Sequence, residues 1–210
     1  MARSKEQNHK IREIRKEKIR EAALQQFVKQ GLFATRIQDI AIAADIAQGL
    51  LYHYYPSKDA IFVDLINDAL DKINDASFFV RDMESSARKK ILFSLRKLLE
   101  TIESSQAFSD TCHLIAQATN STAIPEEAQQ LIEEKRDIPY QVIAEVMETG
   151  QREGSIVKGD PMMLAILFWT SVNGLAIYYA KDKDMGPFPD YRILASMFLV
   201  DKEPEEEDEA

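Results

Sequence analysis

Glycine and proline interrupt this chain only rarely, which favours long helices over strands. Each occurs seven times among 210 residues, and residues that favour helices dominate the stretches between them. No six-residue stretch alternates apolar and polar side chains as a half-buried strand does. We therefore predict an all-α fold, with helices over 11–30, 35–45, 48–55, 58–82, 85–106, 109–119, 125–152 (kinked at Pro139), 160–182 and 189–202.

Charge is divided unevenly along the chain. Residues 1–58 hold 11 Lys and Arg against 6 Asp and Glu, whereas residues 59–210 hold the remaining 15 and 29. The first quarter therefore carries a charge of +5 and the rest −14, which sums to the formal −9 of the whole chain. A basic N-terminal quarter on an acidic body suits a polyanionic partner for that quarter alone.

Cysteine content and the N-terminal sequence indicate the cellular compartment and whether a metal is bound. A single cysteine excludes a disulfide framework and a zinc cluster built from cysteines, and no second histidine lies close to His53 in sequence. The charged N-terminus lacks the apolar region of a signal peptide. We therefore expect a cytoplasmic protein without metal or cofactor.

One segment, Pro161–Ala180, has the length of a membrane span and carries no charge. Thr170, Ser171 and Asn173 lie near its centre, and a helix buried on all sides by its own protein and a second copy gives the same signal. We expect the buried helix and no membrane.

Residues 35–55 have the pattern of two short helices joined by a tight turn. Thr35 and Gln38 have the spacing of a capping box, which predicts a helix starting at Thr35. Asp45 tolerates the left-handed conformation of a tight turn, and Pro56 ends the second helix. Small residues on the inner face complete a helix-turn-helix motif over about 36–55, whose second helix would enter the major groove of DNA.

Side chains on the outer face of the second helix suit contacts with DNA. Gln48 can pair with an adenine edge, Gly49 lets the backbone approach closely, and Tyr52 and His53 can donate hydrogen bonds to phosphate. We expect Lys58 to contact a phosphate at the start of the next helix. The full set of candidate DNA contacts is Thr35, Arg36, Gln48, Gly49, Leu50, Tyr52, His53, Tyr54 and Lys58.

The first helix carries a basic row of Arg12, Lys16 and Arg20, spaced four residues apart beside a row of glutamates. Such rows are usually a solvated face with internal salt bridges. The alternative is that the row helps to anchor the DNA backbone. The sequence leaves both interpretations open.

Residues 36–62, RIQDIAIAADIAQGLLYHYYPSKDAIF, resemble the DNA-binding signature of TetR-type transcriptional regulators. This sequence differs from the signature at three positions. Asp45 replaces the usual glycine, Ala47 replaces the serine or threonine that caps the helix, and Gln48 occupies a position that is commonly basic. The matching positions are Ile40-Ala41, Gly49, Leu51-Tyr52, Tyr54-Tyr55 and Ser57-Lys58-Asp59, with Ala22, Phe27, Gly31 and Thr35 before them.

The resemblance implies a homodimer with a ligand cavity in each acidic body. The expected organisation is a disordered basic arm (1–10), a three-helix DNA-binding domain (11–57), a helical ligand-binding and dimerisation domain (58–202) and an acidic tail (203–210). Candidate cavity residues have odd polarity for a core or form an aromatic wall. They are Phe93, Cys112, His113, Gln117, Tyr140, Trp169, Asn173 and Tyr178.

The expected function is a ligand-responsive, dimeric transcriptional repressor that binds a pseudo-palindromic double-stranded operator. A small, largely apolar or aromatic effector would release it. No nucleophile motif, phosphate-binding loop or carboxylate pair supports an enzyme. The alternative, favoured by Ala47 and Gln48, is a small-molecule-binding helical module whose helix-turn-helix is structural.

Overall fold

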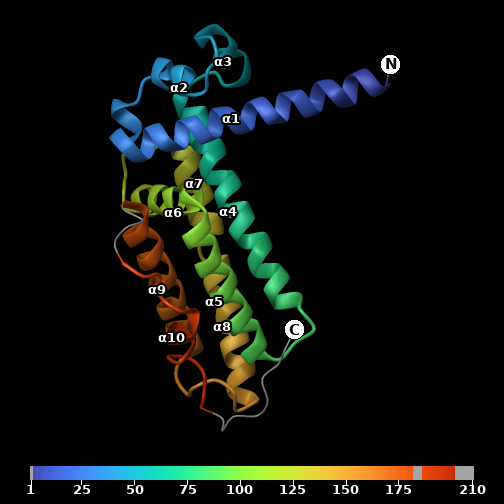
Figure 1. Ribbon diagram of the computed structural model, residues 1–210, viewed down its shortest axis with the longest axis vertical. Coiled ribbons are helices and arrows are strands. Elements are labelled where there is room, and N and C mark those ends of the chain that lie inside the picture. The colour runs from blue at the N-terminus through green and yellow to red at the C-terminus, as the bar shows by residue number, and fades with distance from the viewer. Residues whose placement is uncertain (1, 182–185, 202–210) are drawn as a thin grey trace. The chain divides into compact units, whose positions relative to one another are not determined.

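The protein is built from helices, as its sequence predicts. The computed structural model describes residues 2–181 and 186–201, where the only bridge between extended residues joins Ile156 to Leu199 (Figure 1). The described helices are α1 (Ala2–Ala34), α2 (Ile37–Ala43), α3 (Gln48–Tyr54), α4 (Lys58–Asp82), α5 (Ala87–Ser104), α6 (Gln106–Thr119), α7 (Glu126–Lys135), α8 (Ile138–Arg152), α9 (Pro161–Lys181) and α10 (Tyr191–Ala195).

The chain folds into two compact units, and α4 contributes to both. The first contains α1, α2, α3, α4 as far as Lys72, and the segment Gln106–Lys135. The second contains Ile73–Ser105 and the chain from Arg136 onward. This division differs from the expected boundary at residue 58, because α6 and α7 share the apolar core of the first unit instead of joining the acidic body.

The core of the first unit forms around Phe27 of α1 and Phe62 of α4, whose rings meet edge to face at 5.6 Å. Leu51 of α3 is fully buried there, and Leu114 of α6 and Ile132 of α7 belong to the same cluster. The three N-terminal helices therefore rest on a platform formed by α4, α6 and α7. This platform fixes the position of α3 within the unit.

The second unit is a bundle of α5, α8 and α9, with α10 packed on α5. Phe168 of α9 lies within ring-contact distance of Trp169 and of Phe198. Gly150 of α8 packs so tightly that an added Cβ would lie 2.4 Å from Ile156 Cδ1. A larger residue at this position would force the Ile156 side chain, which folds back on the helix after α8, to shift.

The first helix differs from the prediction at its N-terminal end, and at its C-terminal end it has the predicted interruption at Gly31. We expected a disordered arm over residues 1–10, but the structure describes helix from Ala2 onward. Gly31 has the positive φ of +80° expected for a residue that ends a helix, and a further turn extends to Ala34. The arm prediction was therefore wrong for the described residues, and the C-terminal stop was correctly placed.

Three other local predictions were wrong. The capping box at Thr35 does not form, because α2 begins at Ile37 with Arg36 as its N-cap. The predicted kink at Pro139 is instead a break, and the proline occupies the first turn of α8, where its missing N–H costs nothing. The expected last helix over 189–202 is limited to α10. The acidic tail over 203–210 lies outside the described residues.

Helix α9 is long and apolar enough to cross a membrane, with a mean hydropathy of 1.4 over Pro161–Ala180. One side of it packs against α5 and α8 and buries Ala165, Phe168 and Val172. A core helix of a folded domain passes the same hydropathy test, so the segment is no indication of membrane insertion.

Candidate nucleic-acid interface

The two short helices and their turn form as predicted. Asp45 adopts a φ of +53°, the left-handed conformation that the turn requires. The Ile46 N–H donates to the Ala41 carbonyl at 3.0 Å, and the side chain of Ile46 packs partly buried against the core of the first unit. The turn therefore holds α2 and α3 in the fixed relation of a helix-turn-helix motif.

Helix α3 has a buried face and an exposed face. Leu51 is buried within the helix and Tyr55 is buried directly after it. The predicted DNA contacts Gln48, Gly49, Tyr52 and His53 are all exposed, whereas Leu50 and Tyr54 are half-buried.

Two features of α3 itself affect its approach to a partner. An added Cβ at Gly49 would meet nothing within 4 Å, so the surface there is open to a close approach. Ala47 caps α3 without a side-chain hydrogen bond, as its departure from the family signature implies, which forgoes about 1 kcal/mol of capping.

The structure opposes a DNA contact for Thr35. Its side chain is 1% exposed, and its hydroxyl donates to the Gly31 carbonyl oxygen at 2.7 Å and to the Gln26 carbonyl oxygen at 3.3 Å. The residue therefore closes the C-terminal end of α1 instead of facing a partner. Arg36 next to it is exposed and stays a candidate contact.

The phosphate contact predicted for Lys58 is opposed as well. The Lys58 ammonium donates to the carbonyl oxygens of Leu32 at 2.7 Å and of Phe33 and Thr35 at 2.9 Å each. An ammonium has three protons, so these three acceptors use all of them. Lys58 therefore ties the start of α4 to the end of α1.

Basic side chains of α1 lie against Tyr54 and Tyr55 at the end of α3. Arg15 Nη1 donates to the Tyr54 hydroxyl at 3.3 Å, and the Arg12 guanidinium lies 5.9 Å from the centre of the same ring. The Lys16 ammonium lies 5.3 Å from the centre of the Tyr55 ring. These contacts join residues 39 to 42 positions apart, so they could not be predicted from the spacing of residues within α1.

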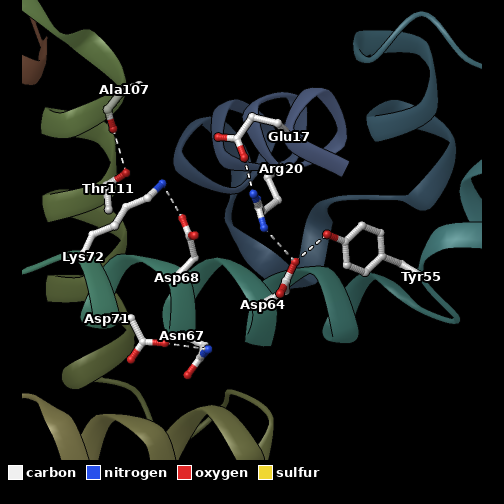
Figure 2. A network of polar contacts seen from close by, with 10 residues as sticks. All are labelled: Glu17, Arg20, Tyr55, Asp64, Asn67, Asp68, Asp71, Lys72, Ala107 and Thr111. Atoms are coloured by element: carbon white, nitrogen blue, oxygen red, sulfur yellow. Dashed lines mark hydrogen bonds and ion pairs between the residues drawn. The ribbon is translucent and has the colours of Figure 1, made fainter. Parts of the chain in front are cut away.

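A polar network anchors α3 and α1 to α4 (Figure 2). The Tyr55 hydroxyl donates to Asp64 Oδ2 at 2.5 Å, and Arg20 Nη1 donates to the same oxygen at 3.4 Å. Arg20 also forms an ion pair with Glu17. Burial, followed by the hydrogen bond to Asp64, raises the pKa of Tyr55 above its ordinary value, so this hydroxyl stays a donor.

The three cations of the basic row of α1 therefore have different partners. Arg20 follows the salt-bridge interpretation, because Glu17 and Asp64 neutralise it. Arg12 and Lys16 form no ion pair with any carboxylate whose side chain the structure describes, and both lie beside α3 instead.

The candidate ligand residues are distributed over the two units. Cys112, His113 and Gln117 lie on α6 in the first unit, where Gln117 Nε2 and His113 Nε2 form a 2.8 Å hydrogen bond. Burial raises the pKa of Cys112 to about 12, so its thiol stays protonated and unreactive near neutral pH.

The other five candidates, Phe93, Tyr140, Trp169, Asn173 and Tyr178, lie in the second unit. That unit has a pocket of about 300 Å³ lined by Asp137, Tyr140, Gln141, Met162 and Ile166, so Tyr140 alone of the candidates lines it.

The remaining aromatic candidates have other surroundings. Trp169 is buried and donates its indole N–H to the Pro139 carbonyl at 3.0 Å, as a core residue does. Phe93 packs against Phe79, and Tyr178 is half exposed. The predicted ligand set therefore does not form one site within either unit.

Within the described residues, no group of three His, Cys, Asp or Glu side chains is placed to hold a metal ion. The features that do converge are a helix-turn-helix motif, an exposed face on its second helix, and basic side chains beside that helix. This combination suits contact with a nucleic acid and offers no reactive group.

Proteins similar to this chain include transcriptional regulators with the same helix-turn-helix motif. The model of the bacterial regulatory proteins of the tetR family matches residues 19–65. The HTH-type transcriptional repressor KstR2 of Mycolicibacterium smegmatis is 30% identical over 89 residues, which are 42% of this chain and 43% of that protein. The matched segment thus spans less than half the length of that relative.

Solved structures extend the likeness in fold to most of the chain. The MbdR regulator from Azoarcus sp. CIB has a TM-score of 0.75 at 21% identity, covering 87% of this chain and 96% of the other. The ketosteroid transcriptional regulator KstR2 of Mycobacterium tuberculosis has a TM-score of 0.72 at 20% identity, covering 89% and 96%. The named relatives are transcriptional regulators, in agreement with the expectation that this protein is not an enzyme. Residues 19–65 of this chain, with their helix-turn-helix motif, therefore match the DNA-binding part of the tetR family of bacterial regulatory proteins.

Proposed function

We propose that this protein is a cytoplasmic transcriptional repressor that binds a pseudo-palindromic DNA operator as a homodimer and is released by a small effector. The exposed face of α3 is the observation that carries the proposal. It presents Gln48, Tyr52 and His53 outward, while Leu51 and Tyr55 anchor the helix from behind. These side chains can donate to base edges and phosphates of duplex DNA.

The exposed face of α9 supports the dimer. Met163, Leu167 and Tyr178 are 56%, 42% and 50% exposed, and Thr170 and Gly174 lie on the same stripe. An added Cβ at Gly174 would meet nothing within 4 Å, so a second helix has room to approach closely. An apolar stripe of this length on a water-soluble domain is typical of an interface between protein chains. A second copy of the same helix would cover it in a twofold dimer.

A largely apolar effector is supported by the composition of the second unit. The pocket beside Tyr140 has Met162 and Ile166 as apolar walls and Asp137 and Gln141 as polar groups. Its volume lies at the low end of the range for small-molecule sites, and it opens to solvent, with Met162 and Ile166 39% and 37% exposed. One structural neighbour is named a ketosteroid transcriptional regulator, which supports the largely apolar or aromatic effector proposed here.

The experiment is a DNA-binding titration of the full chain by fluorescence anisotropy. The probe is the duplex that flanks the protein's own gene, measured at several salt concentrations. We expect a dimeric mass by light scattering and an affinity that falls steeply with salt, because phosphate contacts release counterions. A dimer without salt-dependent binding would favour the alternative, a small-molecule-binding module with a structural helix-turn-helix.

A further inference from the structure

Apart from Arg36 at its first position, the helix-turn-helix motif has no positive charge of its own to balance DNA. Residues 37–57 contain no Lys or Arg, and they contain Asp39 and Asp45. Duplex DNA carries one negative charge for about every 1.7 Å of its axis, and neutralisation of phosphates supplies most of the non-specific affinity. A protein with this motif needs cations from neighbouring elements to bind DNA.

Two of the neighbouring cations are already engaged. Lys58 donates to three main-chain carbonyls, and Arg20 is held by Glu17 and Asp64. Neither can approach a phosphate without giving up these partners.

Three other cations of α1 are placed differently. Arg12 and Arg15 are exposed and contact Tyr54, and Lys16 lies over Tyr55. No carboxylate among the described side chains pairs with any of the three. In Figure 1 the N-terminal half of α1 extends past α3 within the first unit, and the exposed Arg12 and Arg15 lie on this half, within reach of a partner that α3 also contacts.

We propose that Arg12, Arg15 and Lys16 form a cationic flank that binds the phosphate backbone of the duplex beside the groove entered by α3. The inference rests on the proposed DNA-binding function and assigns its electrostatic part to α1 instead of the helix-turn-helix motif. Tyr54 and Tyr55 position the cations, because a ring face attracts a cation and the Tyr54 hydroxyl accepts from Arg15. Base recognition stays with α3.

The test compares the slope of log K against log salt concentration for two charge-matched variants. Arg12→Gln/Arg15→Gln removes two charges from the flank. Arg152→Gln/Lys158→Gln removes two exposed charges from the second unit. Each lost phosphate contact lowers the slope by about 0.9, so we expect the flank variant to lose about 1.8 per protomer and the control to keep the wild-type slope. Lys16→Gln alone should lose about 0.9.

Two further measurements keep the result interpretable. Arg12→Lys/Arg15→Lys should restore the wild-type slope, because charge is the feature that binds phosphate. The ratio of affinities for operator and scrambled duplex should stay unchanged in the Gln variant. A wild-type slope in the folded Gln variant overturns the flank while leaving DNA binding intact. Failure of the wild-type chain to bind DNA in any salt overturns the proposed function itself.

Discussion

Replacing Lys58 separates a structural role from a DNA-binding role for this residue. Sequence analysis predicts a phosphate contact, whereas the structure has its ammonium bonded to three carbonyl oxygens at the end of α1. Lys58→Met keeps most of the aliphatic stem and removes the charge and all three donors. The two roles predict opposite outcomes for stability and for salt dependence.

The size of the stability loss follows from the burial of the acceptors. A hydrogen bond to a charged group contributes about 1.5–3 kcal/mol. The bond to Phe33 is exposed, so water replaces it, and those to Leu32 and Thr35 are partly buried. The substitution therefore removes two partly buried bonds, those to Leu32 and Thr35, which share one ammonium and are partly screened by water. We expect it to lower the free energy of unfolding by about 2 kcal/mol. That corresponds to a decrease of about 4–8 °C in Tm for a chain of this size.

The assay is thermal unfolding followed by circular dichroism, together with the salt slope of DNA binding. Lys72→Met is the matched control, because Lys72 lies on the same helix and forms an exposed ion pair with Asp68 at 2.7 Å, a pair worth less than about 1 kcal/mol. We expect Lys58→Met to melt well below Lys72→Met and to keep the wild-type salt slope. A wild-type Tm with a slope reduced by about one would refute the reasoning and restore the phosphate contact.

Three other substitutions test neighbouring parts of the site. Tyr55→Phe removes the donor to the partly buried Asp64 carboxylate, so urea unfolding should show a loss of about 1–3 kcal/mol; an unchanged midpoint would mean that water satisfies the carboxylate. Trp169→Ala removes a buried indole and its hydrogen bond, and we expect a loss of about 3–5 kcal/mol in the same assay; a stable variant with altered effector response would return Trp169 to a ligand site. Gln48→Ala should weaken discrimination at one base pair by about 1–3 kcal/mol, measured on a set of single-base operator variants. Equal weakening on every duplex would show that Gln48 positions the helix and does not select a base.

The local chemistry of the helix-turn-helix could be predicted because each of its signals is short in range. Asp45 has the positive φ that the turn demands, and Gly31 has the positive φ of a helix end. Leu51 and Tyr55 are buried at the spacing of one helical face. Such signals depend on neighbouring residues alone, so the sequence contains them in full.

The roles of Thr35 and Lys58 could not be predicted, because main-chain carbonyl oxygens compete with the expected partners of both side chains. The salt-bridged row predicted for α1 accounts for the pairing of Arg20 with Glu17 but not for its bond to Asp64. Lys58 bonds to residues 23 to 26 positions earlier, and Arg20 bonds to Asp64, 44 positions later. A cation near a recognition helix suits both a phosphate and a carbonyl cluster. Tertiary packing decides between them, and the membership of α6 and α7 in the first unit is likewise a long-range property.

Helix α4 is continuous from Lys58 to Asp82 and contributes residues to both units. Under the proposed function, it is therefore one segment through which an effector bound to the second unit would act on α3. In the first unit Asp64 bonds to Tyr55 and Arg20, and Asp71 accepts from Lys135 of α7 at 2.6 Å. A rotation of this part of α4 would break these bonds unless α1 and α3 moved with it. Breaking several partly buried charged contacts costs more than the 1–3 kcal/mol typical of allosteric coupling. Under the proposed function, an effector that reorients the end of α4 would therefore shift α3 and the cationic flank together, and it would change base contacts and phosphate contacts in one step.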